Sequence, residues 1–305
     1  MKPRIIVVGS TNTDMIINVP VLPSPGQTVV GSDFNILPGG KGANQAVAAA
    51  RLGADITFIS ALGCDSFGDE SLDRLKSEEI DTRYIVRKPD MHSGIAMIFV
   101  DASGENVIAV SPGANGQLTP EDIIAAEDAF IGTALVILQL EVPPDTVLTT
   151  ARMAKRLGHT VLLNPAPMPP AGLPEGLLKY VDILTPNKGE LMQMEPGAES
   201  IDDAVRLISA KGPGTVVVTL GKDGAKAFES SGSIHINAID VDAIDTVGAG
   251  DCFTAALGVS LAGGNSLEDA LLFGVTASGL STLVCGAQEG MPMYSDVQKH
   301  ITCYR

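Results

Sequence analysis

The segment Asp245–Asp251 (DTVGAGD) joins two carboxylates through a glycine-rich turn, and a helical pattern follows it directly. The N–H groups of Gly248, Ala249 and Gly250 would then lie at a helix N-terminus, where backbone amides and the helix dipole attract anions. A carboxylate at that place, Asp251, suits a base that deprotonates a hydroxyl while the amides hold the charge developing on a phosphoryl group. The alternative is a plain glycine turn in which Asp251 caps the helix.

A second glycine-rich segment, residues 38–53 (PGGKGANQAVAAARLG), opens an alanine-rich helix. Its small residues would let a ligand approach the backbone, and the amide of Asn44 offers both a donor and an acceptor to a sugar hydroxyl. The segment is not a P-loop, because Gly42 follows Lys41 and Asn35 stands where the first glycine of that motif belongs. The alternative is a flexible loop that precedes a well-packed helix.

Acidic and amide side chains follow two of the predicted strands. Asn12 and Asp14 come after the first strand, and Glu141 comes after the strand at residues 135–140. Open α/β sheets bind ligands at the C-terminal ends of their strands, so these three positions are candidate binding residues. For Asn12 and Asp14 the alternative is the hydrogen bonding of an Asx turn.

Two further segments could contribute to a ligand site. Asn187 and Glu190 stand at the predicted start of a helix, where helix capping is the alternative role. Residues 219–225 (TLGKDGA) have the pattern of a strand, a tight glycine turn and another strand, for which an ordinary hairpin is the alternative.

Short β-branched runs alternate with helical segments through most of the chain. The apolar positions of these runs are continuous rather than alternating, as expected for a parallel sheet covered on both faces. The alternation predicts a doubly wound, Rossmann-like α/β fold with a mostly parallel sheet. The predicted strands are residues 4–10, 55–61, 135–140, 160–164, 182–186 and 215–219, and the predicted helices are residues 43–52, 119–129, 145–157, 201–211 and 250–262.

Two stretches, residues 13–37 and 93–110, depart from this alternation because strand patterns follow one another without an intervening helix. These strands need a place outside the main sheet, and a small separate sheet built from two excursions of the core is the economical arrangement. Such a sheet would serve as a lid or a dimer contact, carried by one α/β domain over residues 1–305. The strands predicted there are residues 15–19, 27–31, 94–100 and 106–110.

The charge and the cysteines narrow the class of protein. The 305 residues include 36 acidic and 20 basic side chains, which give a net charge of −16. Such a charge repels phosphodiester backbones and anionic membranes, so binding to either is disfavoured. An N-terminal apolar run at residues 5–8 is too short for a signal peptide, and no window approaches the ~18 apolar residues of a membrane span. We expect a cytoplasmic protein whose scattered cysteines are reduced, namely Cys64, Cys252, Cys285 and Cys303.

Taken together, these residues resemble the ribokinase, or PfkB, family of ATP-dependent carbohydrate kinases. The most specific part is the pair GGKGAN at residues 39–44 and DTVGAGD at residues 245–251, in this order and about 200 residues apart. The resemblance covers nearly the whole chain and implies a Rossmann-like core with a β-sheet lid that pairs in a dimer. Further matching segments are residues 8–14, 139–141, 164–167, 185–190, 219–224 and 286–292.

The resemblance also implies roles for individual residues. Asp251 would take the proton from the primary hydroxyl of the sugar, and Gly248, Ala249 and Gly250 would form the anion hole. The implied sugar-binding residues are Asn12, Asp14, Gly40, Lys41, Asn44 and Glu141. Asn187 and Glu190 would organise phosphate, magnesium and water, while Thr219, Gly221, Gly224 and Gly250 would line the ATP pocket.

A site for an activating monovalent cation, typically potassium, is implied as well. Its matching residues are Asp245, Val247, Ser281, Val284, Gly286 and Gly290. The chain departs from the family at Val284 and Cys285, where members often have a basic pair before the Gly-Ala-Gln sequence.

The implied activity is ATP-dependent phosphorylation of D-ribose at its 5-hydroxyl, which gives ribose 5-phosphate and ADP. Deoxyribose, another pentose, a hexose or a nucleoside are alternative acceptors, and the carboxylates of Asp14 and Glu141 favour a small polyhydroxyl compound over a nucleoside. A catalytically silent sugar-binding regulator would be expected to lose the base or the glycine turn, and both are present. A nicotinamide oxidoreductase is disfavoured, because the first strand leads into residues 9–14 (GSTNTD) without a Gly-x-Gly-x-x-Gly sequence.

Overall fold

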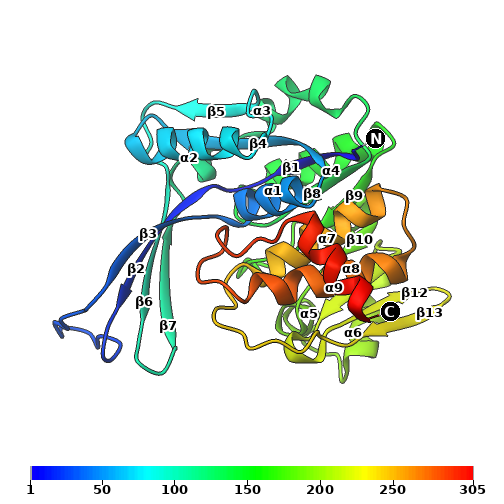
Figure 1. The fold of residues 1–305 in the computed structure, drawn as a ribbon. Helices are drawn as coiled ribbons and strands as arrows, with labels where there is room; N and C mark the ends of the chain where they lie inside the picture. Colours follow the sequence, from blue (N-terminus) through cyan, green and yellow to red (C-terminus); the bar gives the residue numbers. More distant parts are fainter. Residues whose placement is uncertain (1, 305) are drawn as a thin grey trace.

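A nine-stranded, mostly parallel sheet forms the centre of the molecule in a computed structural model that describes residues 2–304 (Figure 1). The strands lie in the order β13-β12-β11-β10-β9-β8-β1-β4-β5, and only the pairings of β12 are antiparallel. The strands are β1 Arg4–Val8, β4 Asp55–Gly63, β5 Ile85–Lys88, β8 Leu135–Leu138, β9 Thr160–Leu163, β10 Ile183–Leu184, β11 Thr215–Thr219, β12 Ala225–Glu229 and β13 Gly232–Ile236.

Helices cover both faces of this sheet because its strands are apolar on both sides. Ile5 and Val7 of β1 belong to one core cluster, whereas Ile6 and Val8 belong to the other. The first cluster includes residues of α1 (Lys41–Arg51), α2 (Ser66–Ser77), α7 (Ala249–Ala262), α8 (Leu267–Ser281) and α9 (Tyr294–Tyr304). The second includes residues of α3 (Pro120–Ala125), α4 (Pro144–Arg156), α5 (Lys188–Met194) and α6 (Ile201–Ser209). The predicted doubly wound α/β fold is confirmed.

Two predicted elements differ most from their expected lengths. The helix predicted at 119–129 ends at Ala125, and a separate 3₁₀ helix follows at Glu127–Phe130. The strand predicted at 182–186 is reduced to Ile183–Leu184, because the chain then turns into the residues that precede α5.

A separate four-stranded sheet, the lid, projects from one side of the core (Figure 1). Its order is β3-β2-β6-β7; β2 and β6 are parallel, and the other two pairings are antiparallel. The strands are β2 Asn12–Asn18, β3 Phe34–Gly39, β6 Gly94–Val100 and β7 Asn106–Ser111. The lid sheet predicted from the two excursions is therefore confirmed.

The strand predicted at residues 27–31 is wrong, because this part of the chain is a loop and β3 begins only at Phe34. A turn precedes the loop, in which the N–H of Gln27 donates to the carbonyl oxygen of Ser24 over 2.9 Å. The β-branched run is left without a partner strand, and Val30 is 84% exposed. The later strand pairs with β2 instead, so that Gly39 lies opposite Asn12 and the chain enters α1 directly.

Candidate active site

Asp251 is the buried centre of a cluster of polar side chains at the start of α7. Only 5% of its surface is exposed, and two side-chain amides from α1 donate to its carboxylate. Nδ2 of Asn44 donates to Oδ2 over 3.0 Å, and Nε2 of Gln45 donates to Oδ1 over 2.9 Å. The capping alternative for Asp251 is wrong, because Gly248 occupies the N-cap position and no side chain caps this helix.

Three side-chain amides that were not predicted as site residues orient the contact with Asp251, namely Gln45, Gln139 and Asn164. The Oε1 of Gln45 accepts a hydrogen bond of 2.6 Å from Nε2 of Gln139, which follows strand β8. Nε2 of Gln45 also lies 3.2 Å from Oδ1 of Asn164, whose own Nδ2 donates to the carbonyl oxygen of Thr185. Each amide is thus oriented by the next, so that the Gln45 donor points at Asp251. The position of Gln139 and Asn164 after strands β8 and β9 was the available signal.

The predicted sugar residues come together beside Asp251, as their places after neighbouring parallel strands require. Oε2 of Glu141 accepts from the backbone N–H of Lys41 over 3.0 Å and from the hydroxyl of Ser10. Asn12 is buried, and its Oδ1 accepts from Nδ2 of Asn115 over 2.8 Å, so its side chain does not form an Asx turn. Asn115 is another residue that the sequence analysis missed.

Asp14 is half-buried and lies against the backbone of Gly39, where an added Cβ would lie 2.2 Å from its Oδ2. Burial raises the pKa of Asp14 to about 7, and the neighbouring charges of Glu141, Asp251 and Glu289 act in the same direction. The pKa of Lys41 is raised chiefly by Asp251, against the effect of its own burial. A cluster of carboxylates around one ammonium group suits the recognition of several hydroxyls on a small molecule.

The turn before α7 has the features of an anion site. Gly248 adopts a left-handed conformation with a φ of 78°. An added Cβ at Gly250 would meet open space, so this first turn of the helix is accessible. The N–H of Ala249 donates to the carbonyl oxygen of Thr246 over 3.2 Å, so this one of the three amides predicted for the anion hole already has a partner in the chain.

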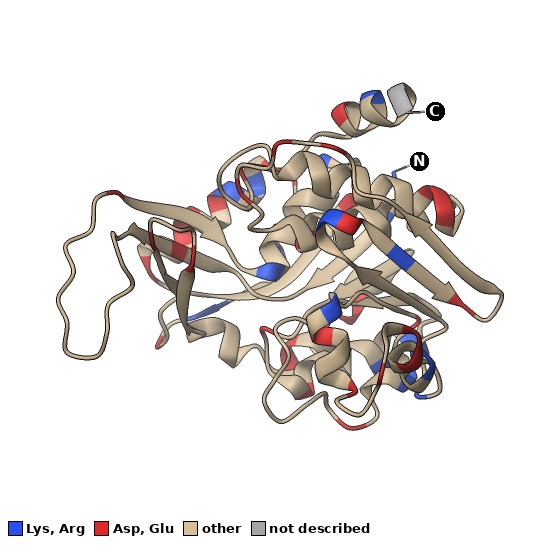
Figure 2. Cartoon of the chain, turned by 90° about the horizontal axis from the view of Figure 1, so that it is seen from below, with Lys and Arg blue, Asp and Glu red and all other residues tan. Residues whose placement is uncertain are grey.

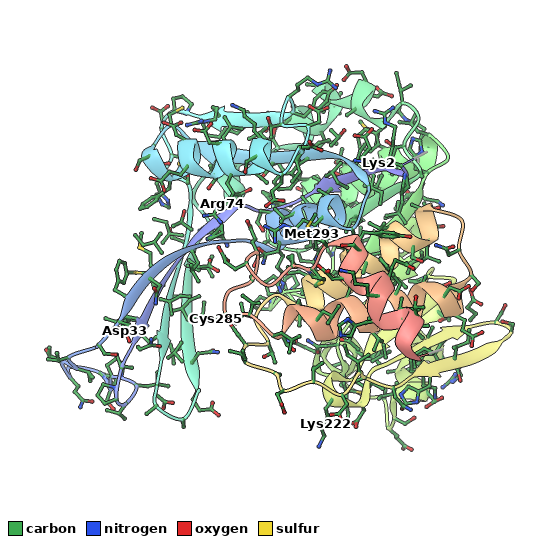
Figure 3. All side chains as sticks on the ribbon, in the orientation of Figure 1. Lys2, Asp33, Arg74, Lys222, Cys285 and Met293 are labelled. Atoms are coloured by element: carbon green, nitrogen blue, oxygen red, sulfur yellow. The ribbon has the colours of Figure 1, made fainter. Side chains whose placement is uncertain are left out.

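A cavity of about 490 Å³ reaches this helix end and brings together the four residues predicted to line the ATP pocket, Thr219, Gly221, Gly224 and Gly250. Lys222 also lines this cavity and lies on the turn between β11 and β12 (Figure 3). The apolar wall of this cavity is formed by Ile239, Val241, Phe253 and Val275. A larger cavity of about 830 Å³ between α4 and residues 168–180 contains none of the predicted site residues.

Asn187 and Glu190 form a reciprocal cap at the start of α5. Oδ1 of Asn187 accepts from the N–H of Glu190, and Oε2 of Glu190 accepts from the N–H of Asn187, each over 2.8 Å. The capping role is therefore confirmed. Burial raises the pKa of Glu190 above its usual value, and Asn187 pairs with Thr219 at the edge of the cavity.

The residues implied in cation binding lie on two adjoining loops and, for Ser281, at the end of α8. Asp245 accepts from the N–H of Val247 over 3.0 Å and from the N–H of Gly286 over 2.9 Å. At Gly290, an added Cβ would lie 2.3 Å from the carbonyl oxygen of Ser281. Cys285 lies on the second of these loops, which faces the lid strands (Figure 3). The side chain of Val284, on the same loop, is half exposed.

A helix N-terminus beside a buried carboxylate is an arrangement that suits phosphoryl transfer without a P-loop lysine. The chain matches the description "pfkB family carbohydrate kinase" over residues 2–293. It therefore belongs to the pfkB family of carbohydrate kinases.

Individual relatives cover almost the same length. The chain is 39% identical to a ribokinase of Staphylococcus aureus over 305 residues, which are 98% of this chain and 100% of the relative. It is 35% identical to a deoxyribokinase of Salmonella typhi over 306 residues, with 98% of each chain covered. Its fold is similar to the structure of Arabidopsis thaliana ribokinase complexed with ribose and ATP, with a TM-score of 0.89, 32% identity and 98% of each chain covered.

Charged side chains are distributed over the core and are rare in the lid, whose four strands carry only Asp14 (Figure 2). Within residues 2–304, no helix combines the length and the apolar character needed to cross a bilayer. Cys64, Cys252 and Cys285 are free thiols, and the side chain of Cys303 lies outside the described part of the chain.

Proposed function

We propose that this protein transfers the γ-phosphoryl group of ATP to the 5-hydroxyl of D-ribose and so forms ribose 5-phosphate and ADP. The observation that carries this proposal is the buried carboxylate of Asp251, oriented by Asn44 and Gln45 next to the open first turn of α7. A hydroxyl held there can lose its proton to Asp251 as its oxygen attacks phosphorus. Residues 1–305 act as one kinase domain with a lid.

The sugar lies between the lid and the start of α1. Asp14 and Glu141 accept hydrogen bonds from its hydroxyls, while Asn12, Asn44 and Lys41 provide donors and Gly40 leaves room for the ring. Glu141 is already oriented by Lys41 and Ser10, which reduces the entropy lost when the sugar binds. In this proposal the primary hydroxyl of the sugar lies at Asp251.

ATP fits the cavity that ends at Gly250. Its base would contact the apolar wall near Ile239 and Phe253, and Thr219, Gly221 and Gly224 would line its path. The phosphates would then point at the helix N-terminus, which attracts negative charge. Magnesium, when bound, would neutralise phosphate charge, to which Lys222 contributes as a basic side chain lining this cavity. Asn187 and Glu190 lie at the edge of this space and would order its water ligands.

A monovalent cation, potassium in this proposal, would be held between the two loops that the hydrogen bond from Gly286 to Asp245 joins. Carbonyl oxygens near Val247, Ser281, Val284 and Gly290 are suitable ligands because backbone oxygens bind weakly hydrated cations without requiring acidic side chains. The cation would fix the loop that leads into Gly248 and the helix N-terminus. Its role is to complete the anion site rather than to contact the sugar.

The protein forms a homodimer through the lid. Register places Ile36, Met15, Met97 and Ala109 in one row across a single face of the sheet, and Phe34, Ile17, Phe99 and Val107 in the next. Several of these side chains are exposed, including Phe34 at 59% and Met97 at 52%. Apolar sheet surfaces of this kind are normally covered, and a second lid of the same shape would cover it. Asp14 lies on the opposite face of the sheet.

Deoxyribose is the second candidate acceptor, because a deoxyribokinase is among the relatives. The experiment is a comparison of kcat/KM for ribose, deoxyribose, a hexose and a nucleoside, with ATP and magnesium present. The proposal predicts the highest value for ribose. The highest value for another acceptor would replace ribose, whereas sugar binding without transfer would indicate a silent regulator. The free thiols and the acidic charge fit a protein of the cytoplasm.

A further inference from the structure

One short loop, residues 286–291, contacts three separate parts of the proposed active site. The N–H of Gly286 donates to Asp245 over 2.9 Å, on the cation loop. Ala287 packs against Gly248, where an added Cβ would lie 2.8 Å from the Ala287 Cβ. Nε2 of Gln288 donates to Oδ1 of Asn44 over 3.2 Å, and Asn44 in turn donates to Asp251. A displacement of this loop would therefore disturb all three parts together.

The loop itself has few internal hydrogen bonds. The N–H of Gly290 donates to the carbonyl oxygen of Gly286 over 3.2 Å, and the N–H of Met291 donates to that of Gln288 over 3.3 Å. It belongs to no strand and no regular helix. Its position must consequently be set by groups outside it.

Arg51, the last residue of α1, provides such a group. Its Nη1 donates to the carbonyl oxygens of Gln288 over 2.6 Å and of Met291 over 3.1 Å. Its Nε and Nη2 donate to the two carboxylate oxygens of Glu78 over 3.0 and 2.6 Å. The pair is largely shielded, since the side chains of Arg51 and Glu78 are 21% and 20% exposed.

The geometry is specific to a guanidinium group. Two of its nitrogens bind the carboxylate in a bidentate fashion, and the third reaches the two carbonyl oxygens of the loop. A lysine would keep the charge but could not span the same four acceptors. The ion pair that the loop itself forms, Arg74 with Glu289 at 3.1 Å, is more exposed, and Arg74 lies near the base of the lid (Figure 3).

We propose that Arg51, oriented by Glu78, is a positioning residue that fixes the loop at residues 286–291 and thereby the base, the anion site and the cation loop. Arg51 touches none of the proposed ligands and acts only through this loop. The proposal deepens the proposed kinase function and rests on it for its effect on catalysis, whereas its structural part stands on the hydrogen bonds alone.

The first test compares Arg51→Lys and Glu78→Gln with wild type, and Arg156→Met serves as the control. Arg156 forms an exposed ion pair with Glu127 on the opposite face of the sheet. We expect kcat to fall about 10–100-fold in Arg51→Lys, because small displacements of catalytic groups have effects of this size. Glu78→Gln should show a smaller fall, and the control should stay within about twofold. An unchanged kcat with only a lower melting temperature would show that Arg51 merely joins α1 to α2 and would overturn the proposal.

A double-mutant cycle identifies the route. If Arg51 acts through Gln288, the effects of Arg51→Lys and Gln288→Leu on kcat should combine to much less than their product. Effects that multiply fully would contradict transmission through this side chain.

Hydrogen–deuterium exchange tests the positioning without reference to activity. In Arg51→Lys, amides of residues 286–291 and 245–247 should exchange faster, while those of β8 and β9 should be unchanged. Equal exchange in the loop would overturn the proposal. Faster exchange together with a wild-type protein that phosphorylates no sugar would refute the proposed function and leave the positioning role standing.

Discussion

Ribose should bind more tightly as the pH rises through about 7, the value to which burial and the nearby carboxylates raise the pKa of Asp14. A neutral carboxyl group has only one strong acceptor oxygen, whereas the ionised group can accept from two sugar hydroxyls. If only ionised Asp14 binds the sugar, the apparent Kd increases as the ionised fraction falls. That fraction is about one half at pH 7 and about one tenth at pH 6, so the Kd for ribose should be about tenfold weaker at pH 6 than at pH 8.

Isothermal titration calorimetry with ribose, without nucleotide, measures this directly between about pH 5.5 and 8.5. Near neutral pH, binding should also release about half a proton, which appears as a dependence of the heat on the buffer. Asp14→Asn should bind ribose weakly and with little pH dependence. Glu141 is the largest charge effect on Asp14, so in Glu141→Gln the midpoint should move to lower pH.

The same shift has a consequence for the stability of the free protein. The pKa of Asp14 is higher in the folded state than its usual value of 3.8, so folding favours the protonated group. This contribution to stability is complete below the unfolded-state pKa and is lost as the pH rises through about 7. Between the unfolded-state pKa of 3.8 and about pH 7, the melting temperature of wild type should therefore fall with pH relative to that of Asp14→Asn. A ribose Kd that is constant from pH 6 to 8, or a pH dependence that persists in Asp14→Asn, would show that ionisation of Asp14 does not control ribose binding.

Gly250→Ala should leave the melting temperature unchanged or slightly higher, because the added methyl group meets open space. The same methyl group would occupy the proposed phosphoryl site, so kcat should fall about tenfold or more. A normal kcat would show that this turn is not the anion site. Replacement of potassium by sodium at constant ionic strength should lower the rate of phosphorylation, and equal rates would mean that Asp245 and Gly286 hold no selective cation. Light scattering at micromolar concentration should show a dimer that Ile36→Glu converts to monomer, and a wild-type monomer would contradict the lid interface.

Most of the fold can be predicted from local patterns of apolar and small residues in the sequence. The continuous apolar run of β1 indicates a strand that is buried on both faces of a sheet, and the small residues of α1 indicate a helix packed closely against such a sheet. These two patterns predict the layers of the fold without knowledge of which strands pair. The strands of the lid are harder to predict, because a sheet that projects from the core need not be apolar on both faces. The β-branched residues near Val30 looked like a strand, but pairing with β2 selected Phe34–Gly39 instead.

Some residues of the candidate site could also be predicted from the sequence, whereas others could not. Asn12, Asp14 and Glu141 could be placed together because parallel strands end at one edge, and the glycine turn before Asp251 marked a helix N-terminus. The amides of Gln45 and Gln139 could not be assigned, because their partners come from positions about 90 to 200 residues away and glutamine alone indicates no chemistry. The high pKa of Asp14 likewise depends on burial and on neighbours that only the folded chain brings together.

Asp251 is the proposed base for phosphoryl transfer from ATP to ribose, and the decisive measurement is kcat of Asp251→Asn. The substitution keeps the size of the side chain and an acceptor for one of the amides of Asn44 and Gln45, but it removes the group that takes the proton. We predict a fall in kcat of about 10²–10⁴-fold, the usual contribution of a general base, with a much smaller change in ribose affinity measured on the same preparation. A variant with kcat close to wild type would show that Asp251 is not the base, whatever the effect of the substitution on stability.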